Sequence, residues 1–344
     1  MNNKKIYNNS MTDKVVCHFT PFHFLLLLIS LLLTACEVEF SPNAKYVETP
    51  VVYCVLDQDA DTNWVRVEKC YLEEGSIYDY GSESQLYTYP QGSLQVCLIK
   101  YYNGQRLSVD NLTETLRPRD SGNFASTPQP LFFTTALLDG NCMYKLEVRH
   151  ADNDSLVAYT DSIPLIRQTN DNLITTPANN MRFRFVNGTC RIAWNSLANA
   201  RRYQPMVRFF YGELGDTLHI DLFCSSILSS DPLSTDYSLS SFLNSVKEAL
   251  KDDPNPKQYL TDKKVQIYLN ACDENLNIYM NSINSGTNLN QATDTYTNIH
   301  GGVGVFAARR THLHKDFLPD NSMVPLGQSA PGLFAYLESL GVGF

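Results

Sequence analysis

The sequence predicts a mainly β protein, with an N-terminal β-sandwich of immunoglobulin or fibronectin type and a second β-rich domain that carries one or two short helices. Apolar or alternating segments of strand length recur along the chain, as in residues 51–56 and 64–71. Turn residues separate these segments, and Asn103-Gly104 is a strong hairpin signal. About 300 residues follow a predicted N-terminal signal, and at roughly 150 residues per domain this length indicates two domains.

Residues 46–166 contain the strands expected for the sandwich. Six or seven short segments with regular turns lie within about 115 residues, which is typical of immunoglobulin-like sheets. Their ranges are 51–56, 64–71, 93–99, 106–109, 131–138, 144–148 and 156–160. We therefore expect the first sandwich to end near Pro164.

Residues 167–344 continue in β-rich sequence, with helical spacing in two places. Strand-like segments occupy 181–185, 190–194, 206–211 and 264–269. Residues 241–251 break this pattern, because Phe242, Val246 and Leu250 fall on one helical face and Pro254 lies just beyond. A second short helix is expected near residues 334–340.

The first 36 residues predict a lipoprotein signal. Basic residues precede the apolar run 24–33, which is shorter than the roughly 20 residues that span a bilayer. The run ends in the lipobox Leu33-Thr34-Ala35-Cys36. We expect cleavage of residues 1–35, acylation of Cys36 and a polar tether over 36–45; Met11 is an alternative start of the chain.

Charge and cysteine usage narrow the class of partner. The chain has 36 acidic and 27 basic side chains, a net charge of −9, and an acidic surface repels nucleic acid.

Seven cysteines follow Cys36, and no pair has the C-x-x-C spacing of a zinc ribbon or a thioredoxin-like site. These cysteines could be small buried thiols or could form disulfides. Because their number is odd, at least one of them cannot pair within the chain.

Four acidic residues have the spacing of calcium ligands. Asp57, Asp59, Asp61 and Glu68 match positions 1, 3, 5 and 12 of an EF-hand loop. Thr62 stands where that loop needs glycine, and the flanking sequence predicts strands rather than helices. An acidic hairpin tip is therefore the main prediction, with calcium binding as the alternative.

His312 and His314 alternate, so on a strand both rings would point the same way, and with Asp316 two residues further on they could bind zinc. No complementary ligand is evident upstream, and an exposed polar strand end is the main prediction. The segment 327–332 misses the G-x-S-x-G pattern of a nucleophile elbow by one position. We expect neither a cofactor nor a catalytic set, and thus no enzyme.

A glycine-rich segment, 298–306, is the most distinctive string of the chain. Gly302, Gly304 and Ala307 formally match a dinucleotide-binding fingerprint, but no helical sequence follows them. The preferred interpretation is a core strand whose glycines let another backbone or an aromatic ring pack closely.

The order of these features resembles a family of Bacteroidota outer-membrane lipoproteins, a domain of unknown function whose genes tend to lie beside TonB-dependent receptors. The features are the lipobox, the strand 51–56, the sandwich, Ile192-x-Trp194 with Ala200-x-x-Tyr203, and the late glycine-rich segment. The resemblance implies no active site. It implies packing roles for Asn298, Ile299, Gly301, Gly302, Gly304 and Phe306.

Together these observations predict a lipid-anchored protein of the cell envelope, held at the outer membrane. We expect a non-catalytic binding or accessory component that works with a TonB-dependent receptor or another surface protein. Attachment to the periplasmic face of the outer membrane and display on its outer face are both left as alternatives, because only a partial acidic run, Glu37-Val38-Glu39, follows Cys36. An adhesin or pilus-like subunit is one alternative, and an extracytoplasmic hydrolase is another.

Overall fold

The computed structural model confirms that the protein is mainly β. It contains three helices in its described part: α3 (Ser84–Tyr87), α4 (Leu239–Leu250) and α5 (Glu274–Ser285). The predicted signal, Cys36, the tether and the helix expected at 334–340 lie outside the described residues. The structure describes residues 46–71, 80–81, 83–119, 127–171, 173–176, 182–183, 185–250, 257–259, 265–285, 296–311, 313–319 and 342–343.

One sheet is built around the first strand of the described chain, β1 (Pro50–Asp57). It pairs with β2 (Asn63–Lys69) in an antiparallel hairpin, and β2 continues to β6 (Gln129–Thr134) and β5 (Thr113–Arg117). Val52, Cys54 and Leu56 are buried while Tyr53 is exposed. This alternation gives the sheet a core face and an opposite face, which we call the outer face.

A second sheet contains most of the remaining strands of the N-terminal half. Its central strands are β3 and β7, and its order is β21-β8-β7-β3-β4, with β9 also paired to β7. Asn103 and Gly104 join β3 to β4 with φ of 48° and 78°, as a two-residue type I′ turn requires, which confirms the predicted hairpin. The bounds are β3 (Leu94–Tyr102), β4 (Gln105–Asn111), β7 (Met143–His150), β8 (Leu156–Thr160), β9 (Ile163–Pro164) and β21 (Ile299–His300).

The two sheets share one hydrophobic core. Val52 and Val67 from the first sheet belong to the same buried cluster as Val96, Leu146 and Val148 from the second. Burial of apolar side chains contributes roughly 25 cal/mol per Å2 removed from water, so this shared cluster stabilises both sheets together.

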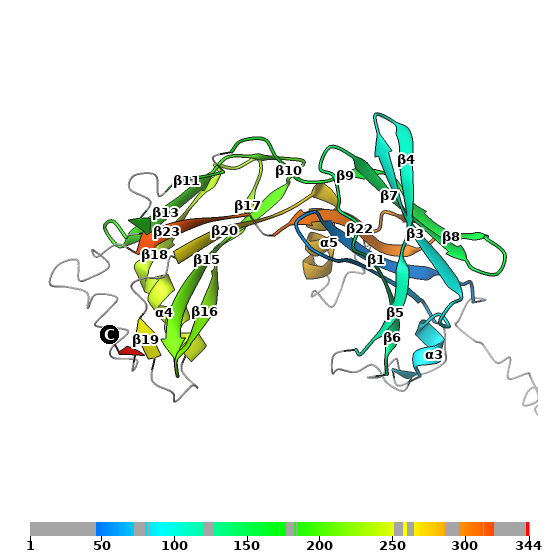
Figure 1. Cartoon of the computed structure of the whole chain (residues 1–344), viewed down its shortest axis with the longest axis horizontal. Coiled ribbons are helices and arrows are strands. Elements are labelled where there is room, and N and C mark those ends of the chain that lie inside the picture. Colours follow the sequence, from blue (N-terminus) through cyan, green and yellow to red (C-terminus); the bar gives the residue numbers. More distant parts are fainter. Residues whose placement is uncertain are drawn as a thin grey trace, which may run out of the picture. The chain divides into compact units, whose positions relative to one another are not determined.

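A strand from much later in the chain extends the first sheet on the other side of β1. β22 (Val303–Arg310) runs parallel to β1, in a register that extends from Val51 opposite Val303 to Asp57 opposite Arg309 (Figure 1). The short β21 pairs with β8 in the second sheet. Strand pairing therefore crosses the boundary predicted after residue 166.

The glycine-rich segment makes this pairing sterically feasible. A Cβ atom on Gly304 would lie 2.0 Å from the carbonyl oxygen of Val52, and one on Gly302 would lie 2.5 Å from that of Pro50. Gly304 also has φ of +121°, a conformation that side chains disfavour. Asn298 closes the turn, since its Nδ2 donates to the Phe306 carbonyl at 2.7 Å and its Oδ1 accepts from the Phe306 N–H at 2.9 Å.

Through the pairing of β20 (Val265–Cys272) with β22, the first sheet continues to β15 (Arg202–Glu213), which also pairs with β16, β17 and β19. β13 lies between β11 and β18 in a separate small sheet. The bounds are β10 (Arg167–Gln168), β11 (Ile174–Thr176), β12 (Arg182–Phe183), β13 (Thr189–Trp194), β14 (Leu197–Ala198), β16 (Asp216–Phe223), β17 (Ile227–Leu228), β18 (Ser234–Ser238), β19 (Lys257–Tyr259), β20 (Val265–Cys272), β23 (His314–Pro319) and β24 (Val342–Gly343).

Helix α4 confirms the helix predicted near residues 241–251. Phe242, which is fully buried, packs its ring within 5.6–6.3 Å of the rings of Phe183, Phe185, Phe209 and Tyr237. Ser238 accepts a hydrogen bond from the N–H of Ser241 at 3.1 Å and so satisfies one free donor of the first turn. None of the helices in the described part of the chain has the length and apolar character that crossing a bilayer requires.

We expect Gly304→Ala to lower the unfolding free energy by about 3 kcal/mol or more, because the new methyl group would meet the Val52 carbonyl in a backbone conformation that disfavours it. Thermal denaturation followed by circular dichroism should show a midpoint lower by roughly 10 °C.

Gly215→Ala is the matched control. Gly215 also has a positive φ, +93°, but nothing lies within 4 Å of its added Cβ atom. It should lower the unfolding free energy by only about 1 kcal/mol. Equal losses in the two variants would contradict the close approach of β22 to β1.

Candidate functional site

Two open cavities flank the beginning of helix α5, and both are lined by Leu276 and Arg309. Their volumes are about 380 and 520 Å3. Volumes of this size fall within the range of small-molecule sites in proteins. We therefore treat the surroundings of α5 as the candidate functional site.

The smaller cavity, here called the sheet-face cavity, has the outer face of β1 and β2 as its floor. Tyr53, Trp64 and Arg66 come from these two strands, and the register places Tyr53 directly opposite Arg66. Tyr279 of α5 and Arg309 of β22 also line it. The rings of Tyr53 and Tyr279 meet edge to face, 6.1 Å apart. Burial, aided by the hydrogen bond to the Tyr53 side chain, raises the pKa of Tyr279, so the Tyr279 hydroxyl stays protonated.

Asp57 anchors the edge of the sheet-face cavity. It is 1% exposed, its backbone N–H donates to Asn63 Oδ1 at 2.7 Å, and its backbone carbonyl accepts from Asn63 Nδ2 at 3.2 Å. Its carboxylate accepts hydrogen bonds from the Asp59 N–H and the Thr311 hydroxyl and lies 3.4 Å from Arg309 Nε. A buried carboxylate needs such partners. The contact with Asp57 in turn holds the Arg309 side chain beside the cavity.

The larger cavity lies between α5 and the strands β15, β16 and β20. Arg202 spans it, because its Nε donates to Asn277 Oδ1 at 2.7 Å and its Nη2 to Asn281 Oδ1 at 3.0 Å. Phe223 and Met280 add exposed apolar surface. Burial raises the pKa of Cys272 to about 11, so its thiol stays protonated and weakly reactive near neutral pH.

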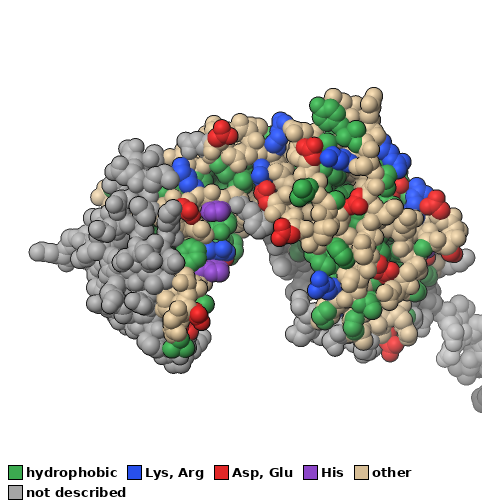
Figure 2. Space-filling view, in the orientation of Figure 1, with side chains coloured by type: hydrophobic (Ala, Val, Ile, Leu, Met, Phe, Trp, Pro, Cys, Tyr) green, Lys and Arg blue, Asp and Glu red, His purple; other side chains and the backbone are tan. Residues whose placement is uncertain are grey.

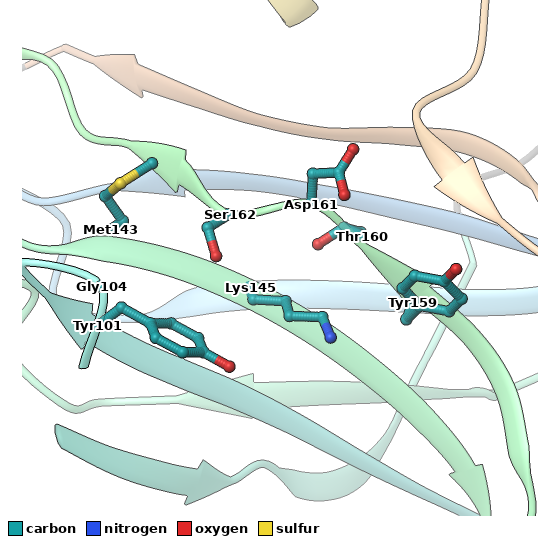
Figure 3. A pocket seen from close by; sticks show the side chains of 8 residues that line it. All are labelled: Tyr101, Gly104, Met143, Lys145, Tyr159, Thr160, Asp161 and Ser162. Carbon is teal, nitrogen blue, oxygen red and sulfur yellow. The ribbon is translucent and has the colours of Figure 1, made fainter. Parts of the chain in front are cut away.

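A third open cavity, of about 380 Å3, lies on the outer face of the second sheet. Lys145 lies between Tyr101 and Tyr159 there (Figure 3). The Lys145 ammonium is 2.9 Å from Glu147 and 5.1 Å from the centre of the Tyr159 ring. His300 stacks on the same ring at 4.6 Å and approaches Asp161 at 3.2 Å. Both charged groups of this cavity, Lys145 and Asp161, are thus paired with neighbouring side chains.

The structure does not bring the four predicted calcium ligands together. Glu68 lies opposite Val51, at the other end of β1 from Asp57, which is roughly 20 Å away at 3.3 Å per strand residue. Arg310 holds Asp59 through two contacts of 2.6 and 3.1 Å, and Arg119 pairs with Glu68. Asp61 is exposed at the hairpin tip.

The histidine candidates are placed only in part, because His312 lies outside the described residues. His314 is an exposed residue of β23 that stacks on Tyr268 at 4.9 Å, with Asp316 4.0 Å away. No group of three metal-ligating side chains occurs in the part of the chain that the structure describes.

The cysteines of the described chain form no disulfide with one another. Cys70 is exposed. The other six, Cys54, Cys97, Cys142, Cys190, Cys224 and Cys272, are buried as small side chains of the core. Burial raises the pKa of Cys224 to about 12 and that of Cys54 further, so these thiols are poor nucleophiles.

The residues of the sheet-face cavity carry no motif that marks them in the sequence. Trp64 and Arg66 were part of a predicted alternating strand, and their position on the same face as Tyr53 depends on strand register. The available signal was a strand whose exposed face carries an aromatic ring and a guanidinium group rather than short polar side chains. Across the face shown in Figure 2, acidic and basic side chains are interspersed with apolar ones.

No protein-family model matches the sequence, and no curated protein matches it. The resemblance to a lipoprotein family therefore stays a prediction. On geometry alone, the site offers aromatic rings, guanidinium groups and neutral hydroxyls around an open hollow, which is chemistry suited to holding a ligand.

The start of α5 should respond to pH through Asp273, which is 6% exposed and accepts a hydrogen bond from the Leu276 N–H at 2.9 Å. Burial raises the pKa of Asp273 to about 6. The folded state therefore binds this proton more tightly than the unfolded state, and the unfolding free energy should fall as pH rises from about 4 to 6.

Asp273→Asn keeps an acceptor for the helix N-terminus but does not titrate. In urea denaturation at several pH values, the unfolding free energy of the wild-type protein should fall by about 1–3 kcal/mol between about pH 4 and 6. The Asp273→Asn variant should lack this decrease. An identical change with pH in both proteins would contradict the assignment.

Proposed function

We propose that this protein is a lipid-anchored component of the cell envelope that binds a ligand or partner without transforming it, and that it works with a TonB-dependent receptor at the outer membrane. The lipobox around Cys36 supports the anchor. The observation that carries the binding role is the sheet-face cavity, where Tyr53, Trp64 and Arg66 line the floor and Tyr279 lines one side.

The proposed scaffold for this role is an immunoglobulin-like or fibronectin-like sandwich. Its support is the shared core of the two sheets, together with the antiparallel hairpins on each side. A sandwich leaves the outer faces of both sheets available to solvent and to partners. The cavity beside α5 and the cavity around Lys145 both lie on such faces.

Binding is favoured over catalysis by the state of the ionisable groups around the cavities. Asp57 is committed to backbone, hydroxyl and guanidinium contacts, and Tyr279 and Cys272 are held neutral by burial. A general base or a nucleophile needs a pKa near the working pH and a free reacting atom. The lining groups described here serve structure and shape instead.

We expect Cys36→Ala to move the protein from the membrane fraction to the soluble periplasmic fraction, because acyl chains contribute about 0.8 kcal/mol per buried methylene to membrane binding. Immunoblotting after ultracentrifugation measures the distribution. Cys17→Ala, which changes a cysteine outside the lipobox, should leave the protein in the membranes. Retention of the Cys36→Ala protein in the membranes would overturn the anchor.

The partnership is tested separately by affinity purification of the tagged full-length protein from detergent-solubilised native membranes. We expect mass spectrometry to identify a TonB-dependent receptor at a stoichiometric ratio. A second lipoprotein of the same membranes, tagged at the same position, should not enrich that receptor. Absence of receptor enrichment, or equal enrichment by the control, would contradict the proposed partnership.

A further inference from the structure

The outer face around the sheet-face cavity is cationic although the chain as a whole carries a net charge of −9. Four guanidinium groups belong to it. Arg66 and Arg309 line the cavity, Arg117 lies 5.0 Å above the Trp64 ring, and Arg119 pairs with Glu68 beside them. Burial, and to a lesser extent the positive charge of the neighbouring Arg66, lowers the pKa of Arg119. Glu68 and Asp57 are the carboxylates paired with these guanidiniums in the described chain.

Two of these guanidinium groups have hydrogen-bonding capacity left for a ligand. Within the described chain, Arg66 forms neither a hydrogen bond nor an ion pair, although its side chain is half-buried between Tyr53 and the cavity. The Arg309 side chain lines the cavity, is 52% exposed and meets Asp57 through Nε, so the contact with Asp57 does not use its two terminal nitrogens. A guanidinium presents five N–H donors, and its planar fork matches a carboxylate or sulfate.

Aromatic rings supply the second part of the site. Trp64 is braced by Phe133, with ring centres 5.2 Å apart, and by Arg117 on its face. Tyr53 and Tyr279 form the edge-to-face pair beside it. Flat aromatic surfaces pack against the C–H faces of sugar rings, while neighbouring polar side chains bind the hydroxyls. Thr62 provides such a polar group at the rim.

We propose that the sheet-face cavity binds an anionic saccharide, a sugar that carries a carboxylate or a sulfate group. In this arrangement Arg66 and Arg309 bind the anionic group, and Tyr53, Trp64 and Tyr279 contact the ring. The volume of about 380 Å3 suits a small ligand or the end of a longer chain. The inference rests on the proposed binding function and specifies the class of ligand.

The test is a titration of the detergent-solubilised full-length protein with oligosaccharides of glucuronic acid, followed by tryptophan fluorescence and calorimetry. The chain has two tryptophans, and Trp194 is 4% exposed, so a change in fluorescence reports on Trp64. We expect at least tenfold tighter binding of the acidic oligosaccharide than of a neutral glucose oligosaccharide of the same length, and weaker binding as salt rises.

Arg66→Gln should weaken binding of the acidic oligosaccharide at least tenfold, and Trp64→Phe should remove the fluorescence change. Arg106→Gln is the matched control, since Arg106 is an exposed residue of β4 in the other sheet. This variant should bind the acidic oligosaccharide with the same affinity as the wild-type protein. Circular dichroism confirms that each variant is folded.

Equal affinity for the neutral oligosaccharide, no effect of Arg66→Gln, or tight binding of poly-glutamate in place of either sugar would overturn the saccharide assignment. The proposed function fails in a different experiment. If the protein still co-purifies with its receptor but binds no acidic sugar, only the ligand class is wrong. If receptor enrichment is lost while sugar binding persists, the ligand class stands and the partnership is wrong.

Discussion

The parallel pairing of β1 with β22 is the constraint on which the other features of the described chain depend. The two strands are about 250 residues apart in sequence, and their register runs without a shift from Val51 and Val303 to Asp57 and Arg309. This register brings Arg309 and Arg310 to the hairpin carboxylates Asp57 and Asp59. It also supports α5, because the Asp273 N–H donates to the Ala308 carbonyl at 3.0 Å. The candidate site is therefore a product of one long-range backbone pairing.

The same pairing explains why charged residues define the edge of the site. Partners in a parallel pair project from the same face, so Asp57 and Arg309 emerge side by side. Burial of Asp57 makes its carboxylate dependent on the Arg309 guanidinium and the Thr311 hydroxyl. A structural ion pair at this position holds one guanidinium in place, while Arg66 on the neighbouring strand keeps its donors for other partners.

Local features of the fold could be predicted from the sequence, because their causes are local. The alternation of β2, the Asn103-Gly104 turn and the apolar face of α4 each depend on neighbouring residues, and the structure confirms them. Helix α5 was missed because its sequence is rich in Asn and Ser, with low helix propensity, and tertiary contacts to β22 stabilise it instead. The calcium alternative relied on the spacing of acidic residues in an EF-hand loop. These residues instead belong to a β-hairpin, whose register places Glu68 far from Asp57. The aromatic and cationic floor of the cavity depends on register across three strands, which no linear pattern encodes.

The late position of β22 has a consequence for how the chain acquires its structure. A polypeptide made from its amino terminus exposes one full edge of β1, with unsatisfied N–H and C=O groups, until residue 310 has been made. Such an edge is a template for intermolecular sheet growth, and the delay spans most of the time of synthesis. Nascent chains of this protein therefore need protection from self-association through a long window, and a truncation anywhere before the glycine-rich segment leaves that hazard permanent.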